Sequence, residues 1–295
     1  MLNPKNFWPS RNFAALDDEL AAFESARFVV LPAPYDATTT WRGGTRGGPD
    51  AIIEASMNME LWERELGCEV GEVGIHTAPD IEPLMSGPEN MAARIEEVVG
   101  EVLDAHKVPV LLGGEHSLSL GGIRALARRS ERLTVVQIDA HTDLCDEYGG
   151  TRFGHGCVMR RASELPSVRI VQIGLRSTSR EEAESLPANV SQFWADDILH
   201  DFSEKLPFLL ADVSGDVYLT FDVDGCDPSW MPDTGTPEPG GLSFYQTRDL
   251  FRALCQKPDV RVRALDCVEL IGGHQASAFA VARLLYKVMG YLSAA

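Results

Sequence analysis

The sequence predicts an α/β fold built around a mainly parallel sheet. Short runs rich in Val, Ile and Leu recur along the 295 residues, and each run is continuous rather than alternating in polarity. Strands that are buried on both faces of a parallel sheet have this pattern. Helical stretches lie between the runs, and no Pro-, Gly- or Ser-rich linker divides the chain. We therefore expect one domain that spans residues 1–295.

Strands and helices are expected to alternate along the chain, which favours right-handed crossovers but leaves the strand order open. The apolar runs that predict strands are residues 27–36, 108–117, 133–143, 168–177, 216–228 and 262–270. The stretches that predict helices are residues 89–105, 118–129, 245–255 and 277–289.

The charge of the chain restricts its partners. Twenty-six Lys and Arg against 44 Asp and Glu give a net charge of −18. A chain this acidic repels phosphate backbones, so nucleic acid is not expected as a partner, whereas cationic ligands and metal ions are favoured.

Membrane insertion and secretion are not expected either. No apolar run reaches the roughly 18–20 residues that span a bilayer, and the first residues, MLNPKNFWPS, lack the apolar core of a secretory signal. The six cysteines are scattered without a CxxC pair, which favours reduced thiols over a disulfide framework. These features predict a cytoplasmic location.

Polar side chains gather where the expected strands end, and ligands of open α/β sheets bind at that edge. These side chains are Glu115, His116, Asp139, His141, Asp143, Asp222, Asp224, Asp227 and Glu269. Several carboxylates after apolar runs are costly to bury unless a cation neutralises them. Strands that end in this way predict one shared cationic site.

The composition of this cluster suits a pair of divalent ions. Alternate spacing places residues 139, 141 and 143 on one face of a strand, and likewise residues 222 and 224. The candidate metal ligands are His116, Asp139, His141, Asp143, Asp222 and Asp224. Oxygen-rich ligation without thiolates favours Mn²⁺ over a structural Zn²⁺. Four carboxylates balance two such ions, which can share a water molecule and lower its pKa.

Simpler roles exist for the same residues. A single histidine such as His116 is more often a buried side chain with satisfied hydrogen bonds, and aspartates such as Asp222 and Asp224 are often helix caps or turn formers. The recurrence of the pattern at three strand ends favours the metal site over these roles.

Three motifs carry a resemblance to a known family. GGEHS at residues 113–117, DAHTD at 139–143 and FDVDGCDP at 221–228 resemble the signature blocks of the ureohydrolase (arginase/agmatinase) family. The likeness extends from residues 34–56 to residues 265–270, which is nearly the whole chain. It implies a three-layer α/β/α fold, two Mn²⁺ ions per chain, and hydrolysis of a guanidinium group to urea and an amine.

The resemblance also implies how the two ions would be held. One ion would take His116, Asp139, Asp143 and Asp222. The other would take Asp139, His141, Asp222 and Asp224. Asp139 and Asp222 would then bridge the two ions.

Catalysis is expected from Asp143, His155 and Glu269. Glu269 would bind the guanidinium group of the substrate, since a carboxylate accepts its forked N–H donors. Asp143 would move the proton of a bridging hydroxide to the leaving nitrogen, and His155, also a substrate contact, would exchange protons with bulk water. The alternatives to these catalytic roles are a salt bridge between Glu269 and an arginine, and a structural role for His155.

Agmatine is the expected substrate, cleaved to putrescine and urea as a step of polyamine biosynthesis. Residues 143–161 and 235–243 resemble agmatinases, and the acidic partner that arginases carry after GLR at 174–176 is replaced by Ser and Thr. A small cationic guanidino substrate also suits an acidic protein. A guanidinobutyrase or another guanidino-acid hydrolase is the alternative, and an arginase is less favoured.

Other features leave alternatives open. Residues 270–277 depart from the Pro-rich turn of many family members, and His274 in this stretch could approach the pocket. A phosphoesterase with two metal ions and a non-catalytic relative that keeps the fold are the rival functions. The resemblance suggests a homo-oligomer, either a trimer or a hexamer.

Overall fold

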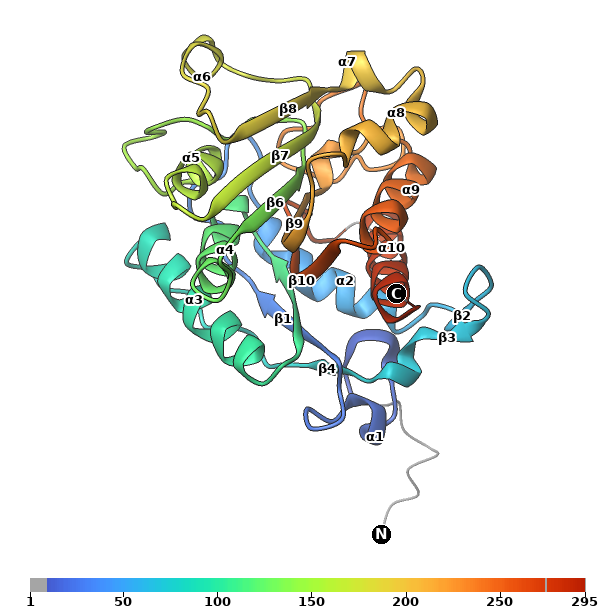
Figure 1. Ribbon diagram of the computed structural model, residues 1–295. Coiled ribbons are helices and arrows are strands. Elements are labelled where there is room, and N and C mark those ends of the chain that lie inside the picture. The colour runs from blue at the N-terminus through green and yellow to red at the C-terminus, as the bar shows by residue number, and fades with distance from the viewer. Residues whose placement is uncertain (1–9, 274, 295) are drawn as a thin grey trace.

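An eight-stranded sheet forms the centre of the computed structural model, which describes residues 10–273 and 275–294 (Figure 1). The strands lie in the order β4-β1-β5-β10-β9-β6-β7-β8, and each neighbouring pair runs parallel. They are β1 (Phe28–Ala33), β4 (Ile75–Thr77), β5 (Val108–Gly113), β6 (Leu133–Ile138), β7 (Val168–Leu175), β8 (Val190–Trp194), β9 (Gly215–Asp222) and β10 (Val260–Val268). The predicted α/β fold with a mainly parallel sheet is confirmed.

Helices connect the strands, and a small antiparallel hairpin lies outside the main sheet. The hairpin consists of β2 (Trp62–Glu63) and β3 (Cys68–Glu69). The α-helices are α1 (Asp18–Ala21), α2 (Gly48–Ser56), α3 (Pro88–Asp104), α4 (Ser119–Ala127), α5 (Val158–Ser163), α6 (Arg180–Glu184), α7 (Ala195–Ile198), α8 (Phe202–Leu209), α9 (Phe244–Cys255) and α10 (Gln275–Ala294).

The helices cover both faces of the sheet and produce three layers (Figure 1). One apolar core packs α2, α9 and α10 against one face, with Ile52 and Phe251 fully buried. A second core packs α3, α4 and α5 against the other face, with Ile95 fully buried. Because side chains alternate across a strand, Val110 belongs to the first core and Leu111 to the second. Burial of each such side chain contributes about 1.5–3 kcal/mol.

The six predicted strands correspond to β1, β5, β6, β7, β9 and β10, and the four predicted helices to α3, α4, α9 and α10. The edge strands β4 and β8 are not predicted, because β4 has three residues and β8 reads VSQFW, without a long apolar run. Helix α2 is missed as well. It starts at Gly48 and Pro49 inside a Gly-rich stretch, where proline suits the first turn of a helix.

The strand order decides which motifs meet. The four central strands β5, β10, β9 and β6 are neighbours, so their carboxyl ends lie along one edge of the sheet. GGEHS follows β5, DAHTD follows β6, FDVD spans the end of β9, and Glu269 follows β10. A site at this edge therefore draws on segments from four parts of the chain.

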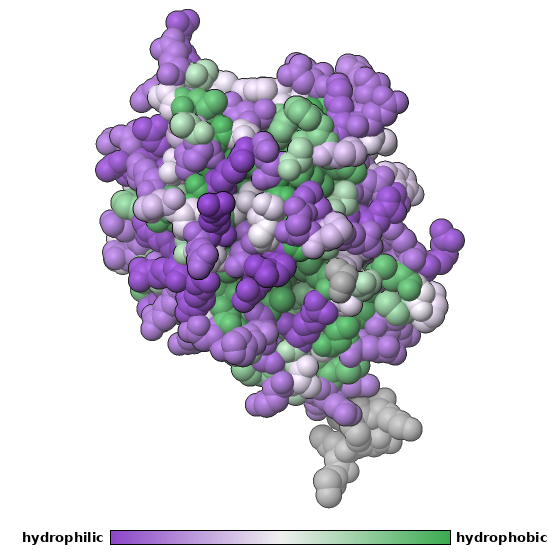
Figure 2. Space-filling view, in the orientation of Figure 1, coloured by the Kyte–Doolittle hydropathy of each residue, from purple (hydrophilic) through white to green (hydrophobic). Residues whose placement is uncertain are grey.

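Hydrophilic side chains cover much of the face drawn in Figure 2, with apolar groups scattered between them. The large exposed apolar side chains lie on different elements, for example Trp41 in a loop and Phe208 in α8. Within the described ranges 10–273 and 275–294, no helix has both the length and the apolar character that crossing a membrane requires.

Candidate metal centre and substrate pocket

The segments that follow β1, β5 and β10 are held together by close backbone contacts. A Cβ at Gly114, after β5, would lie 1.8 Å from the carbonyl oxygen of Tyr35, after β1, so only glycine allows the two backbones to lie this close. The carbonyl of Gly114 accepts a hydrogen bond from the Glu269 N–H at 2.8 Å. Glu269 Oε1 in turn accepts one from the His116 N–H at 2.7 Å. The imidazole of His116 and the carboxylate of Glu269 are thereby fixed side by side.

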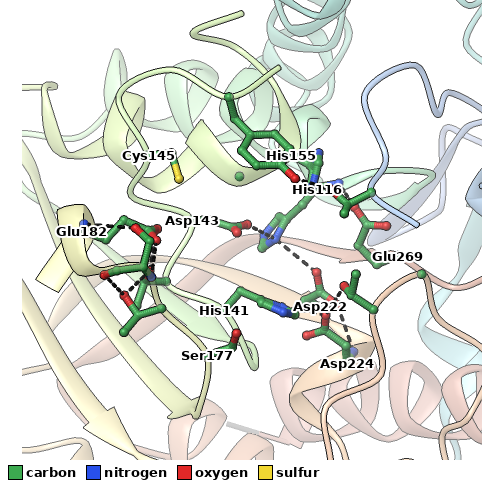
Figure 3. Close-up of a pocket in the computed structure, with 18 residues that line it drawn as sticks. His116, His141, Asp143, Cys145, His155, Ser177, Glu182, Asp222, Asp224 and Glu269 are labelled. Carbon is green, nitrogen blue, oxygen red and sulfur yellow. Dashed lines mark hydrogen bonds and ion pairs between the residues drawn. The ribbon is translucent and has the colours of Figure 1, made fainter. Parts of the chain in front are cut away.

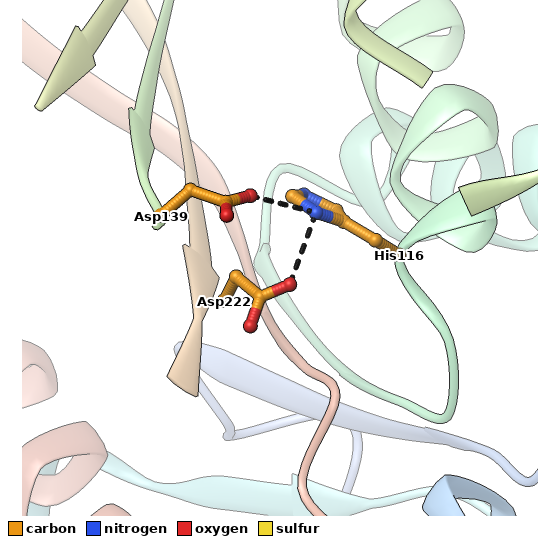
Figure 4. Close-up of side chains that lie close together, drawn as sticks. All are labelled: His116, Asp139 and Asp222. Carbon is orange, nitrogen blue, oxygen red and sulfur yellow. Dashed lines mark ion pairs between the residues drawn. The ribbon is translucent and has the colours of Figure 1, made fainter. Parts of the chain in front are cut away.

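The first candidate group of metal ligands surrounds one nitrogen of His116 (Figure 4). Nδ1 lies 3.1 Å from Asp139 Oδ2, 3.0 Å from Asp143 Oδ2 and 3.3 Å from Asp222 Oδ2. This nitrogen is buried and has no hydrogen-bond partner. The other ring nitrogen, Nε2, lies 2.9 Å from Thr220 Oγ1. An imidazole held in this way directs an unsatisfied atom into a cluster of carboxylates.

A second candidate group shares Asp139 with the first and adds His141 and Asp224. His141 Nδ1 lies 3.0 Å from Asp224 Oδ2 and 3.6 Å from Asp139 Oδ1. The first group consists of His116, Asp139 and Asp222. Within each of the two groups, the ligand atoms all lie within 4.8 Å of one another. The two overlapping groups contain five of the six predicted ligands. The sixth, Asp143, belongs to neither group but lies 3.0 Å from His116 Nδ1 through its Oδ2.

The buried carboxylates of the candidate metal ligands need positive charge nearby to stay ionised. Burial raises the pKa of Asp222 well above its usual range, and burial together with the charge of Asp139 raises the pKa of Asp143 to about 6. Burial opposes the charge of His141, but Asp224 and Asp139 outweigh it and raise the pKa of His141 to about 12. Without a cation, protons on the imidazoles and carboxyls must balance the site, so the donor set fits divalent ions that would replace these protons.

Two of the site residues have a left-handed backbone. Asp143 has φ = 51° and Glu269 has φ = 65°, a region that non-glycine residues seldom adopt and that costs on the order of 1–3 kcal/mol. For Asp143, the start of α5 stabilises this conformation, because the N–H groups of Met159 and Arg160 both donate to the Asp143 carbonyl at 3.0 and 3.1 Å. In this backbone conformation, Asp143 Oδ2 lies 3.0 Å from His116 Nδ1.

Glu269 is 8% exposed and lines the pocket beside the candidate ligands. Burial raises its pKa well above the usual range, and the nearby Glu115 adds to the shift against the hydrogen bond from His116. Among the described ion pairs, none joins Glu269 to an arginine or lysine, so nothing in this part of the chain supports the alternative of a structural salt bridge.

His155 begins a short 3₁₀ helix, His155–Cys157, and is half-buried at the pocket wall. Its ring is held on both sides, with Nδ1 3.3 Å from Thr38 Oγ1 and Nε2 3.0 Å from Thr40 Oγ1. Tyr148 packs edge-on against it with ring centroids 5.4 Å apart. Burial lowers the pKa of His155 to about 4, so the imidazole is neutral at pH 7.

The pocket that these groups line has a volume of about 220 Å³. Figure 3 shows Glu182 on the side opposite Glu269, with the candidate metal ligands between them. Serine and threonine side chains, Ser177 among them, form part of the wall. None of the described lining residues is Lys or Arg.

Comparison with known proteins identifies the family. A family model described as the arginase family matches residues 26–290, which is most of the chain. The chain belongs to the arginase family.

Individual relatives agree with this assignment. A Synechocystis protein named N(1)-aminopropylagmatine ureohydrolase is 37% identical, with 99% of this chain and 97% of that protein covered. An agmatinase of Pyrococcus horikoshii is 31% identical over 94% of this chain and 97% of its own length. The crystal structure of the agmatine ureohydrolase of Thermoplasma volcanium superposes with a TM-score of 0.87 at 31% identity, covering 98% and 96%. The predicted resemblance to agmatinase-like ureohydrolases is confirmed, as is the expectation of an enzyme.

One acidic residue of the arginase-family motifs has a role that the sequence did not indicate. The sequence predicts that Asp227 lies in the cationic site with Asp222 and Asp224, but it belongs to neither group of candidate ligands. Its side chain accepts hydrogen bonds from the N–H groups of Ser229, Gly240 and Gly241 at 3.0, 2.8 and 3.2 Å. Asp227 therefore holds the loop after β9 against residues 235–243.

Glu182 lines the pocket, although Ser and Thr are expected to replace the acidic partner after GLR. The carboxylate of Glu182 accepts from Thr142 Oγ1 at 2.6 Å, from the Leu144 N–H at 2.8 Å and from the Ser179 N–H at 2.9 Å. Burial opposes its ionisation, but these hydrogen bonds outweigh burial and lower the pKa of Glu182. The signal that could have found it is the capping box formed by Ser179 and Glu182 at the start of α6.

The 270–277 stretch lies away from this pocket as far as it is described. Leu270 and Ile271 pair with the segment before Gly235. Leu270 forms an isolated antiparallel β-bridge with Thr234, and the Ile271 N–H donates a hydrogen bond to the Asp233 carbonyl at 2.9 Å. Gly272 and Gly273 line a separate hollow beside α2. His274, which was expected to be able to approach the pocket, lies outside the described residues.

The cysteines of the described chain are free, as predicted. Cys145 lines the pocket, but burial raises the pKa of its thiol to about 12. A thiolate nucleophile is therefore not favoured at this site.

Proposed function

We propose that this chain cleaves agmatine to putrescine and urea with the help of two Mn²⁺ ions. The observation that carries the proposal is a pocket with a carboxylate on each side and no Lys or Arg among its described lining residues. Agmatine complements this arrangement, because it carries a guanidinium group at one end and an ammonium group at the other. Glu269 would bind the first group and Glu182 the second.

The metal ions would be held by His116, His141 and the four aspartates around their Nδ1 atoms, which are Asp139, Asp143, Asp222 and Asp224. Two aspartates, Asp139 and Asp222, would serve both ions, as the family resemblance implies. The mixed carboxylate and imidazole set, without a thiolate, supports Mn²⁺. When bound, two such metal ions lower the pKa of a water molecule toward neutrality and stabilise negative charge that develops in the transition state.

The side chains of the pocket would supply binding, orientation and proton transfer. Glu269 would accept the forked N–H donors of the guanidinium group and hold its carbon beside the ligand cluster. A water oxygen forms a bond to that carbon, and the bond from the carbon to the alkyl nitrogen breaks. Asp143 would carry the water proton to this leaving nitrogen, and His155 would exchange the proton with solvent.

An extended substrate is the second candidate. The Synechocystis relative is named for aminopropylagmatine, which is agmatine with an additional aminopropyl group, and it is 37% identical to this chain. Such a substrate would also suit a pocket edged by Glu182. Guanidinobutyrate is less well suited, because its carboxylate would face that of Glu182.

The test is urea release with Mn²⁺ present, measured across agmatine, aminopropylagmatine, arginine, guanidinobutyrate and guanidinopropionate. We expect the highest kcat/KM with agmatine or aminopropylagmatine, and their ratio decides between the two. A clear preference for arginine or for a guanidino acid would overturn the substrate assignment. Phosphate release from a phosphoester would instead support the rival phosphoesterase.

Metal analysis separates the enzyme from a non-catalytic relative that merely keeps the fold. After loading with Mn²⁺ and removal of free ions, we expect two ions per chain. Fewer than one ion per chain would contradict the proposal. The homotrimer or homohexamer and the cytoplasmic location stay predictions, which sedimentation and cell fractionation can test.

A further inference from the structure

The ring of His155 lies between two threonine hydroxyls that come from the same loop. Thr38 Oγ1 faces Nδ1 at 3.3 Å and also accepts a hydrogen bond from the His155 backbone N–H at 3.1 Å. Thr40 Oγ1 faces Nε2 at 3.0 Å and lies 3.0 Å from the hydroxyl of Tyr148. Both Thr40 and Tyr148 line the pocket, so Nε2 is on the pocket side of the ring.

Glu115 controls the direction of the Thr38 hydroxyl. Glu115 is fully buried, and its Oε2 accepts from the Thr38 backbone N–H at 2.6 Å. Its Oε1 accepts from Thr38 Oγ1 at 2.7 Å and from Ser117 Oγ at 2.5 Å. These contacts hold both the backbone and the hydroxyl of Thr38 against a carboxylate that follows β5.

The donors and acceptors around His155 determine which of its two ring nitrogens carries the hydrogen. A threonine hydroxyl has one hydrogen, and that of Thr38 is donated to Glu115. The oxygen of Thr38 can therefore only accept from His155, and Nδ1 must carry the hydrogen in that contact. In a neutral imidazole, Nε2 is then unprotonated and accepts from the hydroxyl of Thr40.

We propose that Glu115 and Thr38 are positioning residues that fix the tautomer of His155, with the hydrogen on Nδ1 and the lone pair of Nε2 directed to the pocket. This inference rests on the proposed function for its catalytic meaning. In that reaction, Nε2 takes the proton of the Thr40 hydroxyl while the Thr40 oxygen takes one from a water molecule in the pocket. Hydroxide is left in the pocket, and the imidazolium then loses its extra proton to solvent. The opposite tautomer would present an N–H to the pocket and could not accept.

The first test is direct observation of the ring nitrogens of His155 by NMR with ¹⁵N-labelled histidine at pH 7.5. His155→Asn identifies the signals by their loss. In the wild-type chain we expect hydrogen on Nδ1 and an unprotonated Nε2. In Thr38→Val, which keeps the size of the side chain and removes the hydroxyl, we expect a mixture of tautomers or the opposite one. Thr38→Ser should restore the wild-type signals.

The second test is kinetic. Thr38→Val should lower kcat about 10-fold, less than the roughly 10²–10⁴-fold that loss of the acid–base group itself costs, with KM within about twofold. Thr38→Ser should recover kcat to within about twofold, since it keeps the hydroxyl. Thr39→Val is the matched control, because Thr39 is the neighbouring half-buried threonine and makes no side-chain hydrogen bond to another described residue.

The two tests separate failure of this inference from failure of the proposed function. A hydrogen on Nε2 in the wild-type chain, or signals that Thr38→Val leaves unchanged, would overturn the role of Thr38 whatever the substrate is. Absence of urea release from every guanidino compound would overturn the proposed function and leave the NMR result to decide the tautomer. Equal kcat values for Thr38→Val and Thr39→Val would also contradict the inference.

Discussion

The backbone N–H of His116 donates to Oε1 of Glu269 at 2.7 Å, although 153 residues separate the two in the chain. His116 is a candidate metal ligand, and Glu269 is the candidate partner of the substrate guanidinium. A single hydrogen bond thus sets the distance between the place where a metal ion would bind and the place where the substrate carbon would lie. One oxygen of Glu269 is occupied in this way, so the position of its carboxylate is fixed before substrate arrives.

Glu269→Gln should lower kcat/KM for agmatine about 10–100-fold, because an amide cannot accept both forked donors of the guanidinium group and charged hydrogen bonds contribute roughly 1.5–3 kcal/mol. The amide oxygen can still accept from the His116 N–H, so the fold and the Mn²⁺ content should be kept. Urea release and metal analysis on the same sample measure both effects. Wild-type kcat/KM in this variant would remove Glu269 from substrate binding.

Asp143→Asn should lose most turnover, by about 10²–10⁴-fold, because the amide cannot carry a proton to the leaving nitrogen. Asp80→Asn is the control, since Asp80 is exposed and contacts none of the candidate ligands. The measurement is kcat at saturating agmatine, with Mn²⁺ content determined in parallel. Near-normal turnover would remove the proton-transfer role of Asp143.

Glu182→Gln should raise KM for agmatine about tenfold, because the variant removes the charge that would face the substrate ammonium. The amide oxygen of glutamine can still accept from the Ser179 N–H and keep the capping box of α6, but its NH2 group then faces the Leu144 N–H, which loses its acceptor. Butylguanidine, which lacks the ammonium group, is the control substrate, and its kinetics should not change. An equal effect on both compounds would indicate a structural role for Glu182.

Removal of metal should destabilise the chain, because the carboxylates around His116 and His141 lose their counter-charge. At a Mn²⁺ concentration of about 100 times Kd, one bound ion stabilises by about 2.7 kcal/mol, which corresponds to roughly 5 °C in Tm. Thermal unfolding with chelator and then with added Mn²⁺ measures the shift. Asp224→Asn should reduce it, and an identical Tm with and without Mn²⁺ would argue against a metal site.

Asp227→Ala should lower the free energy of unfolding by about 1–3 kcal/mol, since three donors lose their acceptor. The hydrogen bonds from Ser229 and from Gly240 and Gly241 lower the pKa of Asp227 despite its partial burial. A lowered pKa gives stability that is fully present above the unfolded value of about 3.9 and is lost as the pH falls through the folded value. The difference between variant and wild type should therefore be constant from pH 5 to pH 8, as denaturant unfolding at several pH values can check.

The sequence predicted the elements of the fold that have a strong local pattern. Continuous apolar runs such as Val108–Gly113 are typical of buried strands, and a period of 3.6 residues indicates α3. The edges of the sheet lack this pattern. A strand as short as Ile75–Thr77 exists because β1 offers it hydrogen bonds, and no local signal reports that.

The same division holds within the site. The motifs placed His116, Asp139 and Asp222 at strand ends, where short alternating carboxylates are conspicuous in the sequence. The partners of His155 are different, because Thr38 and Glu115 are ordinary residues in separate segments. Glu182 is not predicted from the sequence either, because its position at the pocket depends on how α6 packs against Thr142.

By itself, the sequence determined which side chains were available at the ends of the parallel strands, and with them the chemistry of carboxylates and imidazoles. Only the tertiary structure decided that β5, β10, β9 and β6 are neighbours, and hence that these side chains face one another. The reason is physical: apolar periodicity is a property of a few consecutive residues, whereas strand order and side-chain hydrogen bonds depend on contacts between segments far apart in the chain.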